Sequence, residues 1–427
     1  MLKSPLSNFP DRAIIHFDGD AFFVSVEQTK DYRLRGKPVV TGGERHIAAA
    51  MSYEAKKRGV KRGMNLRAIR EVCPEAIILP SDYETYCIFA RRMYNIARRW
   101  TDRVEEYSID ECFVDITGLD ASLGLSYEEI AFNIKKELEM KLGITFGVGL
   151  GPNKVLAKIG SKHQKPAGFT VIAESNRKEI LKDLLIERIW GIGPSLSTLL
   201  RRQGIFTALD LAEKDNSWIL DHGLAKPCRE IWLELRGEFV KEIETKEERG
   251  HSHSIMRTRT FSSPTSDAAS IFSELSHNIE EACLRLRQNK LVTRAVTFYL
   301  KSQEFRYYSV EVPLESGTVL PHRIIEVAQN YFHKMYRKGI LYRASGVTLR
   351  SLVPEGNINI DLFGATEKED SEKEIFDKVD ELNRKFGHGS IFLGSSMRMS
   401  GQGKDREPPR VATRERNIDI PYLGIVR

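Results

Sequence analysis

The sequence lacks several features that would each place it in a particular class of protein. No stretch of its 427 residues reaches the roughly 18 apolar residues that a transmembrane helix needs, and residues 1–11 contain no apolar core of a secretory signal. The five cysteines are an odd number and form no C-x-x-C pair, which argues against a disulfide framework or a zinc site. We therefore expect a reduced cytoplasmic protein without a membrane partner.

Excess charge is also small, but its placement is informative. The chain carries a net charge of +6. Residues 251–350 hold 14 Lys and Arg against 8 Asp and Glu, whereas residues 1–250 sum to +2 and residues 351–427 to −2. A basic module favours polyanions such as nucleic acid. From charge alone, a solvated basic face explains the excess equally well.

The pattern of apolar residues divides the chain into modules. Strand-like and helix-like segments alternate over residues 1–175, which predicts an α/β fold. Residues 176–240 are helix-rich and broken by glycine, and the polar residues 241–256 fit a linker. Over 257–353 the order strand, helix, strand, strand, helix, strand predicts a separate α+β module. Residues 354–427 combine an apolar island, an acidic helical stretch and a Gly-, Arg- and Pro-rich tail.

Within these modules, periodicity and turn signals predict individual elements. The chain contains no internal repeat, so the elements of one module do not predict those of another. The expected helices fall at 20–30, 48–59, 83–103, 127–142, 153–163, 178–188, 195–203, 266–288 and 321–337. The expected strands fall at 12–18, 39–40, 144–150, 294–301, 307–312 and 344–352, with a hairpin at 104–117.

The most informative residues are carboxylates beside hydrophobic strands. Asp18 ends one apolar run, and Asp110 and Glu111 interrupt a second. Buried carboxylates are costly unless something compensates their charge. A pair of divalent cations would do so, and two metals are what in-line phosphoryl transfer uses. Adjacent residues of a flat strand point to opposite faces, but at a hairpin turn Asp110 and Glu111 can converge beside Asp18.

Water-exposed acids at a turn explain the same spacing about as well as a metal site does. Two further acids, Asp20 and Asp115, stand beyond better-placed carboxylates. We expect structural roles for both of them.

Three other segments are candidate phosphate contacts. Tyr53 and Lys56 lie about one helical turn apart and share a face, so both could reach a triphosphate. The strand-to-helix junction Gly149–Lys154 offers helix amides to an anion but lacks P-loop spacing. Gly191 and Gly193 fit a helix–hairpin–helix turn, whose amides approach phosphate without reading bases. A solvated helix end and ordinary glycine-rich turns are the alternatives.

In this order, the segments resemble those of Y-family DNA polymerases of the bacterial DinB (DNA polymerase IV) type. The resemblance covers about residues 12–395, and the end of the chain near 377–390 also resembles DinB- and UmuC-like chains. Five motifs carry it: His16–Phe23, Ser52–Ala55, Tyr107–Glu111, Asn153–Lys158 and Lys165–Gly168.

The resemblance implies a domain for each module of this multidomain α/β and α+β chain. Residues 1–175 would form the polymerase palm, with fingers inserted at about 30–85. Residues 176–240 would form a helix–hairpin–helix thumb, and 257–353 an α+β little finger that follows the linker 241–256. Residues 354–427 would hold a clamp-binding motif and a tail.

The resemblance also implies roles for single residues. Asp18, Asp110 and Glu111 would be the catalytic carboxylates, and with the carbonyl of Gly19 they would hold two Mg²⁺ ions per active site. Phe23 would be a steric gate, because a ring under the sugar would clash with a 2′-hydroxyl. The implied nucleotide contacts are Phe22, Phe23, Ser52, Tyr53, Lys56 and Lys165, and the implied DNA contacts are Gly191, Gly193, Arg257 and Arg259.

Two positions depart from the family pattern. Lys56 stands where arginine is usual, and lysine is a point charge whereas arginine binds phosphate as a bidentate fork. We expect a weaker grip on the incoming triphosphate. Gly19 stands where larger residues are common, but its implied metal ligand is a backbone carbonyl and should survive the change.

The segment Asn359, Ile360, Asp361, Leu362 and Phe363 is similar to the pentapeptide that binds the bacterial sliding clamp. Two apolar anchors on a tether suit a hydrophobic pocket on a partner. Asn359 replaces the usual glutamine, and a short strand packed on its own domain is the alternative.

The function implied by the resemblance is template-directed addition of deoxynucleotides to a primer 3′ end. It would be error-prone translesion synthesis without proofreading, in DNA repair and SOS-type damage tolerance. The expected partners are primer–template DNA, deoxynucleoside triphosphates and the sliding clamp, and the expected state is a monomer. A non-catalytic DNA-binding scaffold and a palm-type nucleotidyl cyclase are the competing hypotheses.

Overall fold

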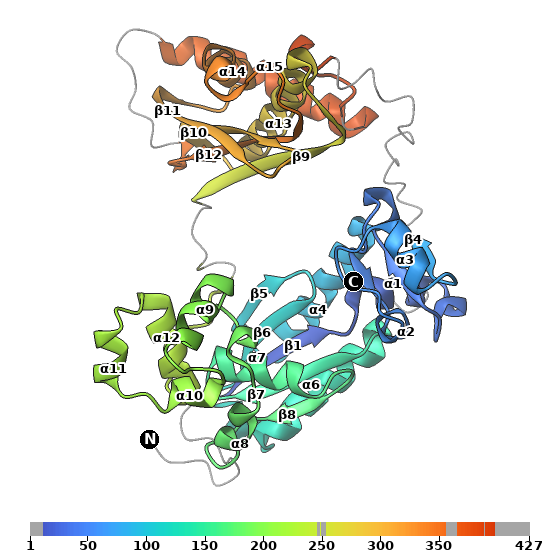
Figure 1. The fold of residues 1–427 in the computed structure, drawn as a ribbon, viewed down its shortest axis with the longest axis vertical. Coiled ribbons are helices and arrows are strands. Elements are labelled where there is room, and N and C mark those ends of the chain that lie inside the picture. Colours follow the sequence, from blue (N-terminus) through green and yellow to red (C-terminus); the bar gives the residue numbers. More distant parts are fainter. Residues whose placement is uncertain (1–11, 246–247, 249–252, 356–364, 388, 398–427) are drawn as a thin grey trace. The chain divides into compact units, whose positions relative to one another are not determined.

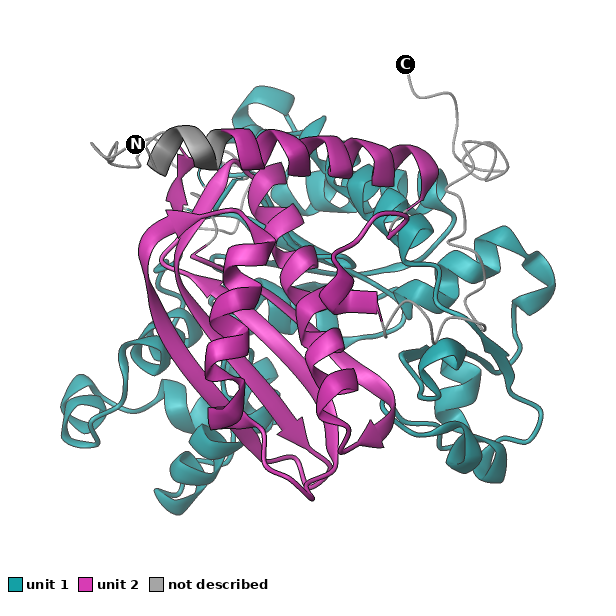
Figure 2. Ribbon diagram, turned by 90° about the horizontal axis from the view of Figure 1, so that it is seen from above, with its two compact units in different colours: residues 1–248, 417–427 teal, residues 249–416 magenta. Residues whose placement is uncertain are grey.

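The computed structural model describes residues 12–245, 248, 253–355, 365–387 and 389–397 (Figure 1). The chain forms two compact units (Figure 2). Unit 1 contains the described residues up to Glu248, and unit 2 contains those from His253 onward. Within the described residues, no helix is both long enough and apolar enough to cross a membrane.

Unit 1 is built on a five-stranded sheet in the order β5-β6-β1-β7-β8. The central strand β1 is buried along its whole length, and it pairs antiparallel with both neighbours. Because side chains alternate along a strand, Ile15 and Phe17 point to one face and His16 and Asp18 to the other. The strands are β1 (Ile14–Gly19), β5 (Val104–Ser108), β6 (Glu111–Asp115), β7 (Phe146–Gly151) and β8 (Phe169–Val171).

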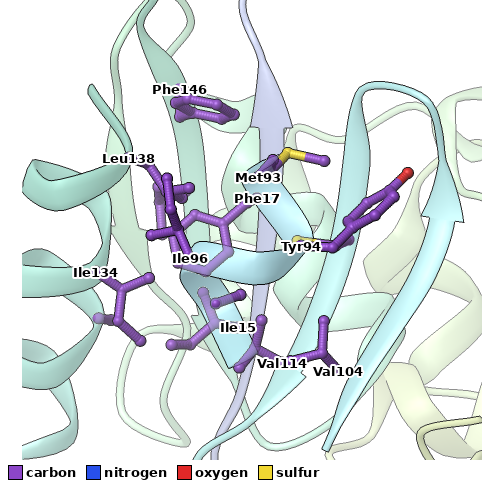
Figure 3. Close-up of a cluster of buried hydrophobic side chains, with 14 of the residues drawn as sticks. Ile15, Phe17, Met93, Tyr94, Ile96, Val104, Val114, Ile134, Leu138 and Phe146 are labelled. Atoms are coloured by element: carbon purple, nitrogen blue, oxygen red, sulfur yellow. The ribbon is translucent and has the colours of Figure 1, made fainter. Parts of the chain in front are cut away.

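Helices cover both faces of this sheet. Ile15 and Phe17 pack in one core with Met93 and Ile96 of α4 and with Leu138 of α6, as Figure 3 shows. On the other face lies α7, which meets β1 and β7. Strand alternation therefore turns His16 and Asp18 toward α7. The helices on this sheet are α4 (Tyr83–Arg98), α5 (Leu119–Leu123), α6 (Tyr127–Leu142) and α7 (Lys154–His163).

A small three-stranded sheet in the order β3-β2-β4 forms a second part of unit 1. Its core is a separate apolar cluster that includes Val40, Ala55 and Ile69. Its elements and those leading to it are α1 (Phe22–Lys30), η1 (Tyr32–Leu34), β2 (Val39–Thr41), η2 (Gly43–Arg45), β3 (Ala50–Met51), α2 (Tyr53–Lys57), α3 (Leu66–Val72) and β4 (Ile77–Leu79).

The expected helix at 48–59 is wrong in its first half. Ala50 and Met51 form β3 and pair with β2, and only then does α2 begin. Ser52 caps the helix by accepting a hydrogen bond from Ala55 N. Tertiary strand pairing overrides the helix propensity of the alanines, and the serine cap fixes the start of the helix.

A helical segment follows the five-stranded sheet, with its own core around Leu200, Leu211 and Trp232. The helix expected at 178–188 ends at Lys182, and a 3₁₀ turn completes the segment. The helix expected at 195–203 corresponds to α9. The elements are α8 (Arg177–Lys182), η3 (Ile186–Arg188), α9 (Pro194–Arg202), α10 (Ala208–Ala212), α11 (Asn216–Asp221) and α12 (Lys226–Leu235).

Unit 2 has the element order that the sequence predicts. Its antiparallel sheet runs β11-β10-β12-β9, and β13 adds a short pairing to β10. The strand expected to stop at residue 312 continues through Pro313, because β11 is an edge strand and a missing N–H is tolerated there. The elements are β9 (Ser254–Thr265), α13 (Ala268–Gln288), β10 (Leu291–Ser302), β11 (Tyr307–Thr318), α14 (Pro321–Met335), β12 (Tyr342–Arg350) and β13 (Val353–Pro354).

The acidic stretch near the end of the chain forms α15 (Ala365–Phe386), which packs on the core of unit 2 through Phe376. Asp380 accepts two hydrogen bonds from the Arg287 guanidinium on α13, at 2.7 and 2.8 Å. Beyond it, η5 (Gly394–Ser396) also contacts α13, where Leu393 N donates to Glu280 Oε2 at 3.2 Å. The pentapeptide 359–363 lies outside the described residues.

Candidate active site

Three carboxylates line one cavity where β1 ends and β6 begins. Asp18 and Glu111 are paired in the register of these strands. The backbone carbonyl of Asp110, in the turn before β6, accepts a hydrogen bond from Gly19 N at 2.9 Å. The Ser108 hydroxyl donates to Asp110 Oδ1 at 2.6 Å and lies 3.4 Å from Glu111 Oε2. The turn therefore places Asp110 and Glu111 near each other and beside Asp18, as the hairpin hypothesis requires.

Three lysines from α7 and the turn after it neutralise these acids. Lys158 Nζ donates to Glu111 Oε2 at 2.8 Å. Lys165 Nζ donates to Asp18 Oδ1 at 2.5 Å. Lys162 Nζ lies 3.3 Å from Glu111 Oε1 and 3.9 Å from Asp18 Oδ2. Lys158 and Lys162 were not among the predicted site residues, although their spacing of four places them on one helical face.

Burial and neighbouring charges shift the acids in opposite directions. Burial raises the pKa of Asp18 to about 6, although the Lys165 ammonium opposes the shift. Burial also works against ionisation of Glu111, yet His16, when protonated, and Lys158 lower its pKa to about 2. Burial holds the pKa of His16 well below its usual range, so the ring is neutral near pH 7. Near pH 7 the ammonium groups of Lys158 and Lys162 therefore keep the pKa of Glu111 low.

The chemistry of these donors fits a hard divalent cation, which prefers carboxylate and carbonyl oxygens. In the part of the chain that the structure describes, no three acidic, His or Cys side chains form a ready metal cluster. Instead, ammonium groups contact the oxygens of Asp18 and Glu111. A metal ion bound here would replace the contacts of Lys165 with Asp18 and of Lys162 with Glu111 Oε1, so these two side chains would have to move.

A cavity of about 980 Å³ opens beside the carboxylates. Helix α2 and the turn after it supply a basic wall, which includes Lys56, Lys61 and Arg62. Ser52 is not in the lining, because its buried hydroxyl donates to Lys37 O and caps α2. The predicted residues that do line the cavity are Asp18, Gly19, Phe22, Phe23, Tyr53, Lys56, Asp110, Glu111 and Lys165.

Phe23 presents a rigid ring at this cavity. It stacks on Tyr86 with ring centroids 4.3 Å apart and an interplanar angle of 11°, and Tyr83 meets it edge-on at 5.4 Å. The Tyr86 hydroxyl is fixed in turn, because it donates to Glu27 Oε1 at 2.7 Å. The ring of Phe23 is thus held by packing and not free to yield to a ligand.

Asp20 has a structural role in this arrangement. Its buried carboxylate accepts hydrogen bonds from the Tyr53 hydroxyl at 3.1 Å, Thr145 Oγ1 at 2.9 Å and Ala167 N at 2.7 Å. These partners belong to three separate parts of unit 1, so Asp20 joins α2 to the lysine turn. Asp115 is similarly held by Arg12 and Arg103, at 3.3 and 3.2 Å.

The start of α7, where a substrate phosphate was a candidate ligand, instead binds a carboxylate of the protein. Glu234 of α12 accepts a hydrogen bond from Val155 N at 3.0 Å, and Asn153 caps Leu156 N at 3.0 Å. Lys154 is buried in an ion pair with Glu105. Since these groups are satisfied within the fold, the Gly149–Lys154 junction is not a substrate phosphate site.

The glycine turn before α9 has one sterically required glycine. Gly191 has φ of +91°, and a Cβ there would lie 2.7 Å from Ile231 Cδ1. Gly193 is the N-cap residue of α9, and a Cβ there would meet nothing within 4 Å. Gly191 therefore fixes the backbone path of this turn, while Gly193 leaves the helix start open.

Arg257 and Arg259 do not lie on the open face of the unit 2 sheet. They are paired in register with Val347 and Ser345, on the face that packs against the helices. Arg259 lies 3.7 Å from Glu274 of α13. The distribution of charge along the chain does not reveal the opposite face, whereas strand alternation does. That face carries Tyr299, Lys301, Tyr307 and Arg343.

Comparison with known families matches residues 17–162 to the impB/mucB/samB family and residues 252–362 to the impB/mucB/samB family C-terminal domain. The chain belongs to this family. A DNA polymerase IV of Desulfatibacillum aliphaticivorans is 31% identical over 384 residues, which cover 89% of this chain and 96% of the relative. A DNA polymerase IV of Streptococcus pyogenes serotype M1 is 31% identical over 370 residues, which cover 85% of this chain and 100% of the relative.

Solved structures agree with this assignment. A Y-family DNA polymerase chimera of Dbh and Dpo4 matches with a TM-score of 0.69 and 27% identity, over 80% of this chain and 99% of the chimera. An insertion ternary complex of Dbh DNA polymerase matches over the same shares, with a TM-score of 0.52 and 28% identity. The resemblance to DinB-type polymerases and the multidomain α/β and α+β fold are confirmed, and the family member is a DNA-directed DNA polymerase.

Proposed function

We propose that this polymerase extends a primer 3′ end by two-metal catalysis, with Asp18, Asp110 and Glu111 as metal ligands. The observation that carries the proposal is that all three acids line one cavity of about 980 Å³ with a basic wall, and that Asp18 and Glu111 are paired in strand register. The matched Dbh structures include ternary complexes, which supports binding of both DNA and nucleotide. The Gly19 carbonyl, at the end of β1, would complete the ligand set.

Divalent ions would activate the primer hydroxyl and stabilise the leaving pyrophosphate. The chain's own residues would bind and orient the substrates. Lys165, Lys56 and Arg62 place positive charge around the cavity, where the triphosphate would lie. Tyr53 would add a hydroxyl that Asp20 already orients.

We assign the five-stranded sheet to the palm, the β3-β2-β4 sheet to the fingers and residues 177–235 to the thumb. Unit 2 would be the little finger. The basic and aromatic side chains on its open sheet face would contact DNA phosphates, independent of sequence. Arg257 and Arg259, at the edge strand, would contribute charge and not direct contacts, because Arg259 is paired with Glu274.

Tolerance of damaged templates fits the composition of the cavity wall. Ala21, Ala49, Ala50 and Gly59 line it with small side chains, which leave room for a distorted base. The kinship with proteins named DNA polymerase IV supports translesion synthesis in DNA repair. An SOS-type role, error-prone synthesis without proofreading, a cytoplasmic location, a monomeric state and a clamp partner at 359–363 stay predictions from the sequence.

The test is primer extension on a primed template with Mg²⁺ and deoxynucleotides. Wild type should extend the primer, EDTA should stop it, and Asp110→Ala with Glu111→Ala should lower the rate by at least roughly 10³-fold. Asp102→Ala, at an exposed acid away from the site, is the matched control. A wild-type protein that binds the duplex but extends nothing would instead be a non-catalytic scaffold.

A further inference from the structure

Glu111 accepts a hydrogen bond from a lysine that lies among aromatic rings. Lys158 Nζ lies 4.1 Å from the centroid of the Tyr107 ring and 5.1 Å from that of Trp190. The same atom donates to Glu111 Oε2 at 2.8 Å, and the side chain is 7% exposed. A desolvated ammonium between rings and one carboxylate cannot leave without losing both partners.

This contact decides which oxygen of Glu111 faces the acids of the site. Lys158 holds Oε2, while Oε1 lies 3.3 Å from Lys162 Nζ, on the side of Asp18. Lys162 is half exposed, so it can give way to another cation. Lys158 therefore orients Glu111 so that Oε1 faces Asp18. Lys162 contacts Oε1 and can be displaced from it.

The ring that covers Lys158 belongs to the thumb turn, residues 189–193. Trp190 Nε1 donates to the Tyr107 hydroxyl at 2.8 Å, and the two rings meet edge to face at 5.3 Å. The next residue is Gly191, whose conformation fixes the path of the turn. A cavity of about 620 Å³ borders Glu111, Lys158 and Trp190, so this side of the carboxylate is open toward the thumb.

We propose that Lys158 is a positioning residue for Glu111 and that Trp190 holds Lys158 in place, so that the thumb turn and the catalytic carboxylate are coupled. The inference rests on the proposed function, because it takes Glu111 as a metal ligand. A duplex gripped at the thumb turn would fix the Trp190 ring, and through Lys158 the orientation of Glu111. The contacts Trp190–Tyr107, Tyr107–Lys158 and Lys158–Glu111 are continuous.

The kinetic test combines two substitutions. Lys158→Met keeps the apolar stem and should lower kcat by about 10- to 100-fold, because small misplacements of a catalytic group cost that much. Trp190→Leu should lower kcat in the same direction by about tenfold, and the double variant should be no slower than Lys158→Met alone. The Kd for a labelled primer–template, measured by fluorescence anisotropy, should change by less than about twofold for Lys158→Met.

A second measurement needs no turnover. Binding of Mn²⁺ to the free full-length protein is followed by electron paramagnetic resonance. Lys158→Met removes a positive charge beside Glu111 and should raise the Mn²⁺ affinity by about threefold or more, although kcat falls. A residue that merely supports the fold would lower both quantities. Opposite signs are thus the signature of positioning, and a joint loss overturns the proposal.

Lys241→Met is the matched control, because Lys241 Nζ lies 5.6 Å from the Trp190 ring but contacts none of the three acids. Its kcat should stay within about twofold of wild type. An unchanged kcat in Lys158→Met would overturn the coupling, and so would losses of kcat that multiply in the double variant.

A backup variant covers the case in which Lys158→Met fails to melt cooperatively. Tyr107→Phe removes only the acceptor of the indole N–H and should lower kcat by about threefold. An inactive wild type would refute the proposed function. A higher Mn²⁺ affinity in Lys158→Met would then still support the contact between Lys158 and Glu111, and a lower affinity would overturn it.

Discussion

At the level of single residues, the motif His16–Phe23 divides its side chains between chemistry and support. Asp18 reaches the cavity, whereas Asp20, two residues on, is buried among three hydrogen-bond donors. Phe23 faces the cavity and stacks on Tyr86. Adjacent members of one motif thus have different tasks, which follow from where the chain turns after β1.

Phe23→Ala should raise the incorporation of ribonucleotides relative to deoxynucleotides, by at least roughly tenfold in the ratio of kcat/KM values. The reason is that removal of a stacked, immobile ring frees the space that a 2′-hydroxyl would need. Single-nucleotide insertion assays measure the ratio. Tyr32→Ala, at an exposed ring, is the control, and unchanged sugar discrimination in Phe23→Ala would remove the gate role from this residue.

Lys56→Arg should lower the KM for incoming deoxynucleotides by about three- to tenfold, since a guanidinium fork makes stronger phosphate contacts than an ammonium. Lys56 lines the cavity on α2, so the longer group has room to reach the triphosphate. Steady-state insertion kinetics provide the measurement, and Lys57→Arg on the exposed side of the same helix is the control. A higher KM in Lys56→Arg would contradict the phosphate role.

Among elements, α7 has the central position in unit 1. The N–H groups of its first turn bind the Glu234 carboxylate of α12, and its later turns carry Lys158 and Lys162 to Glu111 of β6. Asn153 strengthens the first junction, because its side-chain amide donates to Glu234 O and Glu238 O at 2.7 and 2.8 Å. One helix therefore links α12 to the carboxylates of the cavity.

Glu234→Ala should lower the free energy of unfolding by about 3 kcal/mol, because two backbone N–H groups lose a buried charged acceptor. Those donors are Val155 N and Lys241 N, both at 3.0 Å. Glu234→Gln keeps one acceptor oxygen and should lose about half as much. Urea unfolding followed by circular dichroism gives the values, with Arg229→Gln at an exposed position of α12 as control. Equal stability of all three variants would disprove the anchor.

The helix α15 offers a similar test in unit 2. Asp380→Ala leaves the buried Arg287 guanidinium without its carboxylate and should cost about 3 kcal/mol of stability. Arg287→Met added to Asp380→Ala should restore much of that loss, because no charge then remains buried. Thermal unfolding of the full-length protein measures both, and Asp377→Ala, elsewhere on the same helix, controls for helix propensity. A double variant as unstable as the single one would show that packing alone holds α15.

For the whole molecule, the excess positive charge of residues 251–350 has a direct consequence for DNA binding. The logarithm of the association constant should fall linearly with the logarithm of salt concentration, and Lys301→Ala should reduce the slope by about one. Lys301 lies on the open sheet face beside the rings of Phe305 and Tyr307. Anisotropy titrations at several salt concentrations supply the slopes, and Lys378→Ala on α15 should leave the slope unchanged.

The sequence by itself determined the element order of unit 2, the alternation of β1 that turns Asp18 away from the core, and the motifs of the acidic site. These features are local, because strand and helix periods and turn residues are written within a few positions. The same locality explains two errors. Strand pairing overrode helix propensity at Ala50–Met51, and an edge position let β11 continue through Pro313.

Only the tertiary structure decided which charges meet. Lys158 lies 47 residues from Glu111, and Glu234 lies 79 residues from Val155, so no local pattern could pair them. Strand alternation likewise places Arg257 and Arg259, the expected DNA contacts, on the helix-covered face with Val347. Buried ions must find partners within the fold, and packing, not sequence distance, selects those partners.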